Sequence, residues 1–289
     1  MKQLILALTF IQQMITAQAA ALIKKENIVL AQDEDFKPYW EYGMGFGYVH
    51  YEQYPSSNQL SNFLLPFPTF QYRGKIIRAS DRDGARAYLL KGPNWSLELS
   101  GAFYPSVNSN ENDARRGMPD IPWMIALGPK YVYNFNDHLT LSAGLFQATT
   151  TDLRKTELTG ELFESVIRYQ WHREHTFGRI SFKLRGGTQD FLSTYFDVKP
   201  NQATLNRTTY HSHGGLLNNE LAYFQYFKRG KITFYFGVAN ENYSLSSNRK
   251  SPLHKSDNNI IYLSGLTYSL GESSKEAIPE SETTGIIQK

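Results

Sequence analysis

Two histidines and one serine stand side by side at His211, Ser212 and His213. Serine catalysis needs an imidazole that reaches the hydroxyl from the same side of the backbone. Neighbouring side chains of an extended chain point to opposite faces, so this spacing separates both imidazoles from the Ser212 hydroxyl. The two imidazoles share a face, but no carboxylate or thiolate stands beside them to complete a metal site. We therefore interpret the segment as a solvated loop.

Other catalytic and cofactor-binding patterns are also missing from the sequence. It contains no glycine-rich phosphate loop, zinc motif or nucleophile elbow. It has no cysteine, which excludes disulfides, thiolate metal sites and thiol nucleophiles. Its 30 basic and 27 acidic side chains give a formal charge of +3, far from the positive field that a phosphate backbone requires. We predict a protein that is not an enzyme, has no catalytic, cofactor-binding or metal-binding residue, needs no cofactor and binds no nucleic acid.

Charged residues recur at alternate positions of several extended segments, opposite large apolar side chains. Residues spaced in this way share one face of a strand, which in a closed barrel is the inside. Ionic groups in a narrow interior must find partners or water, so they either pair and fill the lumen or line a selective solute path. The candidate lumen charges are Glu98, Lys130, Glu164, Arg168, Arg179, Lys183, Arg185, Glu220 and Glu241.

The apolar side chains opposite these charges repeat with a period of two, which is typical of β-strands. From Trp40 to Tyr48, bulky side chains alternate with Glu41 and three glycines. The same pattern returns along the chain, and Leu217 and Leu221 are assigned to the outward apolar face of one such segment. The segments are about 9 to 14 residues long, which is what a tilted strand needs to cross a bilayer.

Short and long connections alternate between these segments. Short links are expected at 73–74, 91–94, 134–137, 173–174 and 228–230, and long polar links at 52–62, 105–120, 150–158, 189–213 and 244–258. A further turn at 81–84 divides one stretch into two short strands. We predict an all-β fold, an antiparallel up-and-down transmembrane β-barrel of twelve strands with short periplasmic turns and longer extracellular loops.

The tryptophans fit this arrangement. With the short turns in the periplasm, three indoles fall at periplasmic strand ends and one falls at an outer strand end. An amphipathic ring is stabilised at the boundary between hydrocarbon and water, whereas a soluble core is the alternative location. The predicted interface aromatics are Trp40, Trp95, Trp123 and Trp171.

The start of the chain indicates the compartment. Met1 and Lys2 precede an apolar stretch that ends with small residues at Ala17 and Ala19, which predicts a secretory signal peptide at 1–19. We assign 20–38 to a periplasmic N-terminal segment, 39–270 to the barrel and 271–289 to a disordered polar tail. The expected location is the bacterial outer membrane of a Gram-negative cell envelope, with outer-membrane lipid as a partner.

Several short strings then indicate a family. Tyr195 and Phe196 are followed at fixed spacing by further residues of the most specific string, while weaker strings are 65–68 with 71–73, 94–97, 116–117 with 120–121, and 251–253. Together they resemble the MltA-interacting protein (MipA/OmpV) family of outer-membrane proteins, from about Trp40 to Leu270. From its residues alone, the most specific string is expected to form a short, chemically unreactive helical cap over the outer mouth. This family-motif loop comprises Tyr195, Phe196, Val198, Pro200, Gln202 and Ala203.

The resemblance implies a scaffold that links a murein lytic transglycosylase with a peptidoglycan synthase. The chain departs from the family pattern at Asp197, where glycine is common, and at 247–250 before Ser251. Two alternatives from other classes stay open. The barrel could be a narrow solute channel, or a surface adhesin that acts through its extracellular loops.

Overall fold

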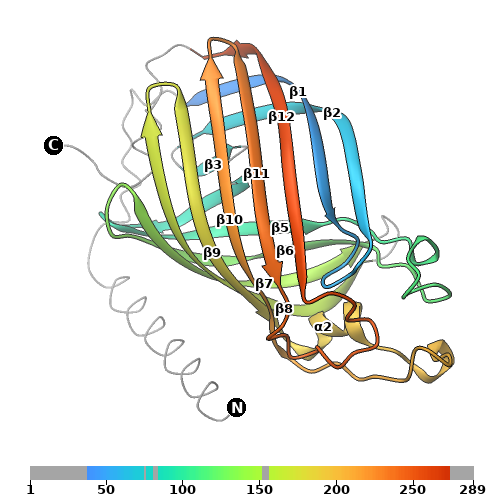
Figure 1. Cartoon of the computed structure of the whole chain (residues 1–289). Helices are drawn as coiled ribbons and strands as arrows, with labels where there is room; N and C mark the ends of the chain where they lie inside the picture. Colours follow the sequence, from blue (N-terminus) through green and yellow to red (C-terminus); the bar gives the residue numbers. More distant parts are fainter. Residues whose placement is uncertain (1–37, 75, 81–83, 152–155, 274–289) are drawn as a thin grey trace. The chain divides into compact units, whose positions relative to one another are not determined.

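The computed structural model is a closed antiparallel β-barrel of twelve strands, in which neighbours in the sequence pair and β12 returns to β1 (Figure 1). It describes residues 38–74, 76–80, 84–151 and 156–273, so the predicted signal peptide and most of both terminal segments lie outside the described residues. The strands are β1 (Tyr39–Glu52), β2 (Leu60–Arg73), β3 (Ile77–Ser80), β4 (Gly84–Lys91), β5 (Trp95–Tyr104), β6 (Trp123–Asn134), β7 (Leu139–Thr151), β8 (Thr156–Arg173), β9 (Thr176–Gly187), β10 (Gly215–Arg229), β11 (Ile232–Asn242) and β12 (Asn258–Glu272). The predicted twelve-stranded up-and-down barrel is confirmed.

The two ends of the barrel differ in their connections. At the end where β1 begins and β12 finishes, the links are two to four residues long, and we call this the short-turn end. The opposite, long-loop end carries α2 (Gln189–Phe196) and two 3-10 turns, η1 (Ser109–Glu111) and η2 (Pro200–Gln202). In the described part of the chain, no helix is long and apolar enough to cross a membrane.

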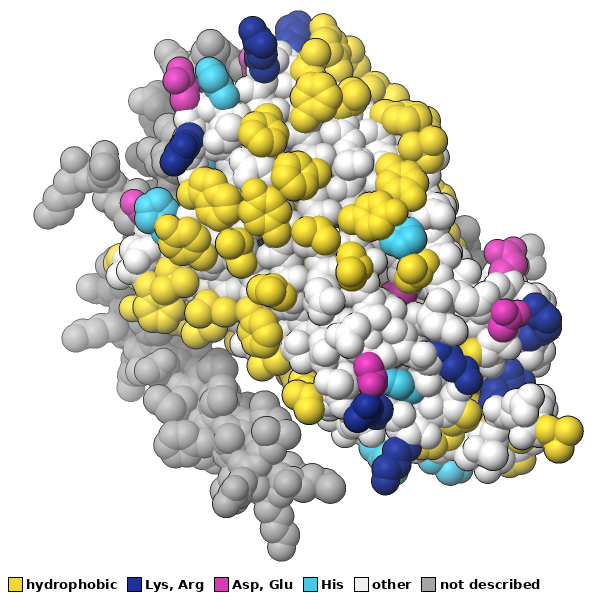
Figure 2. Space-filling view, in the orientation of Figure 1, with side chains coloured by type: hydrophobic (Ala, Val, Ile, Leu, Met, Phe, Trp, Pro, Cys, Tyr) yellow, Lys and Arg dark blue, Asp and Glu magenta, His cyan; other side chains and the backbone are white. Residues whose placement is uncertain are grey.

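The strands form because their side chains alternate in polarity with the period of the pleat. On β1, Tyr42, Met44 and Phe46 are each about half exposed, whereas the glycines between them are buried. The other strands repeat this pattern, and Figure 2 shows apolar side chains spread over the strand surface, with charged side chains on the loops. The barrel wall therefore turns an apolar surface outward and a polar surface inward.

Two sequence-based predictions are wrong, and β12 extends two residues past the predicted end of the barrel at 270, to Glu272. Leu217 was expected to point outward with Leu221, but the register shifts between Leu216 and Asn218, and Leu217 is 1% exposed. A bulge of this kind turns a side chain to the other face. The connection expected at 150–158 is also shorter, because β7 continues to Thr151 and β8 begins at Thr156. Threonine is a good strand former, and its polar character concealed this continuation.

The four tryptophans lie near strand ends. Trp40, Trp95 and Trp171 lie at the short-turn end, and Trp123 is the first residue of β6 at the long-loop end. Trp95 stacks on Tyr131 with ring centroids 6.0 Å apart, and Trp123 lies 5.0 Å from the ring of Phe103. Aromatic rings therefore border the apolar surface at both of its edges.

The largest apolar core of the barrel lies at its long-loop end. Four connections contribute to it, and they pack on inward side chains of β6, β7 and β8 such as Met124 and Ala148, both 0% exposed. We call this cluster the loop core. Its members are Tyr54, Val107, Met118, Ile121, Met124, Ala126, Phe146, Ala148, Leu162, Phe191, Leu192, Tyr195, Phe196, Val198, Leu217, Tyr243 and Leu253.

Gly45 provides a test of how closely the inner wall is packed. A Cβ atom on Gly45 would lie 2.5 Å from the ring of Phe67 on β2, which is closer than carbon atoms approach. We expect Gly45→Ala to lower the free energy of unfolding by about 1–3 kcal/mol, since overpacking costs this much. Urea unfolding in detergent micelles measures the change.

The matched control is the same substitution in a Phe67→Leu background. A smaller side chain at 67 leaves space for the new methyl group, so the loss should shrink, which is the non-additivity expected of residues in contact. Equal losses in both backgrounds would contradict this account of the contact.

Candidate functional site

The barrel interior is the candidate site, because inward strand positions bring charged residues together there. Cross-strand register places Glu164 beside Arg185 and Lys183 beside Glu220. The Arg185 guanidinium lies 3.9 Å from Glu164, 3.5 Å from Glu220 and 3.8 Å from Glu241. The Lys183 ammonium lies 3.7 Å from Glu164 and 3.4 Å from Glu220. Two cations thus hold three carboxylates, and this arrangement offsets much of the penalty for removing charges from water.

A second polar cluster lies between this network and the loop core. The Tyr243 hydroxyl is hydrogen-bonded to both Glu52 and Glu241, and the side-chain amide of Asn259 donates to Glu52. All four residues are buried. Burial, together with the two carboxyl groups, raises the pKa of the Tyr243 phenol well above its ordinary value, so the phenol stays protonated.

One phenolic proton cannot satisfy two carboxylates. Tyr243 can donate to one of them, so the other must itself carry a proton and donate it to the phenol oxygen. Glu241 faces Arg185, whereas no cation of the described chain forms an ion pair with Glu52. The structure therefore favours a neutral Glu52 carboxyl, which fastens the ends of β1, β11 and β12 beneath the loop core.

The family-motif loop contributes apolar side chains and backbone to the loop core. Tyr195, Phe196 and Val198 are at most 3% exposed, while Pro200, Gln202 and Ala203 form and cap η2. The Arg115 guanidinium donates to the Tyr195 carbonyl at 3.3 Å, and the Ser251 hydroxyl donates to the Phe196 carbonyl at 2.8 Å. These contacts hold the loop in place, and they explain the string as a structural cap over the long-loop end.

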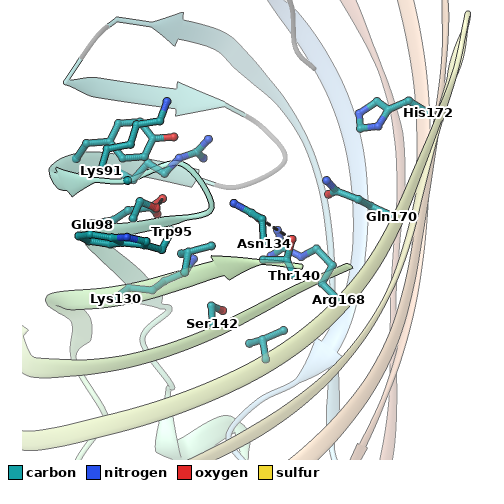
Figure 3. Close-up of a pocket in the computed structure, with 16 residues that line it drawn as sticks. Lys91, Trp95, Glu98, Lys130, Asn134, Thr140, Ser142, Arg168, Gln170 and His172 are labelled. Atoms are coloured by element: carbon teal, nitrogen blue, oxygen red, sulfur yellow. Dashed lines mark hydrogen bonds between the residues drawn. The ribbon is translucent and has the colours of Figure 1, made fainter. Parts of the chain in front are cut away.

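Two adjoining cavities occupy the lumen on the other side of the ion-pair network. One, of about 240 Å³, is lined by residues such as Arg179 and Lys183. The other, of about 70 Å³, lies toward the short-turn end and is lined by 16 residues, among them Lys91, Glu98 and His172 (Figure 3). Both are lined by Lys130 and Arg168, so they adjoin. Four Lys or Arg side chains and one carboxylate line the smaller cavity, which gives it an excess of positive charge.

All nine predicted lumen charges lie inside the barrel, but they fall into two groups. Five form the ion-pair network, namely Glu164, Lys183, Arg185, Glu220 and Glu241, and three of these, Glu164, Lys183 and Glu220, also line the larger cavity. The other four, Glu98, Lys130, Arg168 and Arg179, line the cavities. Sequence reasoning missed Glu52, Arg78 and Arg86, which are inward as well. Glu52 belongs to the predicted long link 52–62, and Arg86 lies in a predicted short strand, where the alternation is too brief to assign a face.

The histidine and serine segment has no catalytic arrangement. The Ser212 hydroxyl donates to the Gln189 carbonyl at 3.5 Å, and its backbone N–H donates to Asp197 at 2.7 Å. Both His211 and His213 are exposed. Within the described ranges, no group of three or more His, Cys, Asp or Glu side chains is placed to hold a metal ion.

The protonation of the Glu52 cluster gives a prediction with a matched pair of isosteric variants. In Glu52→Gln the amide N–H replaces the carboxyl O–H toward Tyr243 and its oxygen accepts from Asn259, so the free energy of unfolding should stay within about 1 kcal/mol of the wild type. Glu241→Gln removes the charge that faces Arg185 and should cost about 3 kcal/mol. Urea unfolding at pH 7 compares them, and a larger loss for Glu52→Gln would contradict the assigned proton.

Comparison with known protein families gives a match that covers most of the barrel. The family model described as MltA-interacting protein MipA matches residues 43–270. Curated protein sequences give no match. Similar solved structures include a Pseudomonas aeruginosa FadL homologue (9% identity, 81% of this chain and 91% of that chain covered, TM-score 0.33) and the CymD monoaromatic hydrocarbon channel (10% identity, 82% and 90% covered, TM-score 0.36). Both likenesses are too distant to carry a functional argument.

Proposed function

Since this chain belongs to the MltA-interacting protein MipA family, we propose that it is an outer-membrane β-barrel that binds a murein lytic transglycosylase at its periplasmic rim. The same proposal includes a peptidoglycan synthase as a second partner, so that the barrel acts as a scaffold between the two enzymes. It assigns no catalytic role to the barrel itself.

The outward apolar surface supports the location. Rings border this surface at both edges, as in barrels that cross the outer membrane. Such barrels place their short turns and both chain ends in the periplasm, which here puts the short-turn end on the inner side. A secretory signal peptide at 1–19 is part of this proposal.

The loop core is the observation that carries the choice of a docking role. Its side chains fill the long-loop end, and the ion-pair network lies directly behind them. This arrangement supports docking over a solute path, because both layers would have to separate before a solute could cross. The short-turn end has no comparable covering among the described residues, so partners can reach it from the periplasm.

The turns at that end are small, whereas stable complexes bury about 800 Å² per partner. We therefore assign most of the contact area to the chain outside the barrel, residues 20–38 and 273–289. The first segment leads into the first residue of β1 and the second follows the last residue of β12, so both join the barrel at the short-turn rim.

Crosslinking in intact envelopes tests the proposal. A mild crosslink followed by purification of the barrel should recover a lytic transglycosylase, and deletion of residues 274–289 should reduce the recovery severalfold. The matched control is Leu205→Asp, since Leu205 is fully exposed at the opposite, long-loop end. It should leave the recovery unchanged.

Two results would contradict the docking role. One is an envelope from which no murein enzyme is recovered with the barrel. The other is discrete conductance of the purified protein in planar bilayers that changes in Arg168→Gln, which would support the solute channel instead. An effect of Leu205→Asp without an effect of the deletion would move the binding surface to the extracellular loops, as an adhesin requires.

A further inference from the structure

In the part of the chain that the structure describes, the strand pairing of the barrel wall has a gap between β2 and β5. Among these residues, β3 has four residues and pairs with β2 only at Tyr72 and Arg73. In the same described part, β4 pairs with β5 only as far as Ser100. Within the described residues, positions 60–71 of β2 and 101–104 of β5 therefore have no strand partner on the sides that face each other.

The side chains at this gap are apolar and accessible. Phe63 on β2 and Ala102 on β5 occupy inward positions by strand alternation, yet Phe63 is 52% exposed and Ala102 is also exposed. Pro66 and Pro68 on β2 lack the backbone N–H, as prolines on edge strands do. Irregular wall at membrane depth is tolerated only where it lines a cavity or is covered, and an apolar occupant would cover this gap.

Three arginines lie in one row just below the gap. Arg73 is the cross-strand partner of Arg78, and Arg78 is the partner of Arg86, so three guanidinium groups follow one another across β2, β3 and β4. Directly opposite residues lie about 4.5 to 5.5 Å apart, and like charges at this spacing are destabilising. An anion bound between the three guanidinium groups would turn this repulsion into attraction.

Arg78 is the central residue of the row, and one N–H group of its guanidinium is not used by the surrounding side chains that the structure describes. It is 4% exposed, its Nε donates to the Gly74 carbonyl at 3.4 Å, and its guanidinium lies 5.2 Å above the ring of Tyr88. Its Nη1 is buried and has no hydrogen-bond partner among the described residues. A guanidinium donor in this state is costly unless a ligand oxygen accepts from it.

We propose that the arginine row and the gap together bind an anionic amphiphile from the bilayer, with its phosphate or carboxylate on Arg78 and its acyl chain in the gap. Arg78 is two residues from the end of β3, about 7 Å, so the head group and the start of the chain can be engaged together. The proposal goes beyond the docking role and does not depend on it, because no transglycosylase takes part.

Binding to the full-length barrel in dodecyl maltoside micelles tests this inference, with dodecyl phosphate and inorganic phosphate as the two probes and native mass spectrometry as the measurement. The detergent supplies a neutral amphiphile with the same chain, so binding of dodecyl phosphate reports the anionic head. The wild type should bind dodecyl phosphate at least tenfold more tightly than inorganic phosphate.

Variants separate the two parts of the site. Arg78→Gln should weaken dodecyl phosphate binding at least tenfold, and Arg78→Lys, which keeps the charge but loses the planar fork, should give an intermediate loss. Ala102→Trp should weaken dodecyl phosphate but not inorganic phosphate, since it narrows the gap only. Arg229→Gln is the matched control, because Arg229 is exposed at the same end but outside the row.

Three outcomes would overturn the proposal. The first is the absence of saturable binding of dodecyl phosphate to the wild type. The second is equal binding by the wild type, Arg78→Gln and Arg78→Lys, with the fold of each variant checked by its thermal unfolding. The third is equal affinity for the two probes together with no effect of Ala102→Trp, which would leave an oxyanion site without entry from the bilayer.

Discussion

The alternation of side chains across each strand is the constraint on which the rest of this structure depends. A closed antiparallel sheet pairs its backbone donors within the wall, and here this pairing is continuous except between β2 and β5, so the wall can meet hydrocarbon on one side. Successive side chains must then face two different surroundings. On β1 this gives half-exposed Tyr42, Met44 and Phe46 outside and buried glycines inside, where Phe67 and Tyr235 fill the space that the glycines leave.

The same constraint forces charge into the interior, and the molecule accommodates it in three layers. At the long-loop end, apolar side chains from four connections exclude water. Behind them, Glu52, Tyr243 and Glu241 share protons and Arg185 binds three carboxylates. Toward the short-turn end, positive charge is in excess around the smaller cavity. The lumen is thus closed by side-chain packing at the long-loop end and carries an excess of positive charge near the short-turn end.

Much of this could be predicted from the sequence, because the period of two is local. Strand number, the short turns and the nine lumen charges all follow from residues within one or two strand lengths of each other. What could not be predicted depends on partners far apart in the chain. The loop core joins Tyr54 to Leu253, Glu52 meets Tyr243 across the closure of the barrel, and the arginine row exists only through the register of β2, β3 and β4. The predicted orientation of Leu217 was wrong for a related reason, since the position of a bulge is set by pairing with the neighbouring strand.

The claim that the outward face contacts lipid can be measured directly, because the chain has no cysteine and single thiols can be introduced cleanly. Leu145→Cys places a fluorophore on the outward face of β7, and Ser142→Cys places the same fluorophore on the wall of the lumen. In vesicles of brominated lipid, the account predicts strong quenching at position 145 and little at position 142. Equal quenching at the two positions, or none at position 145, would contradict it.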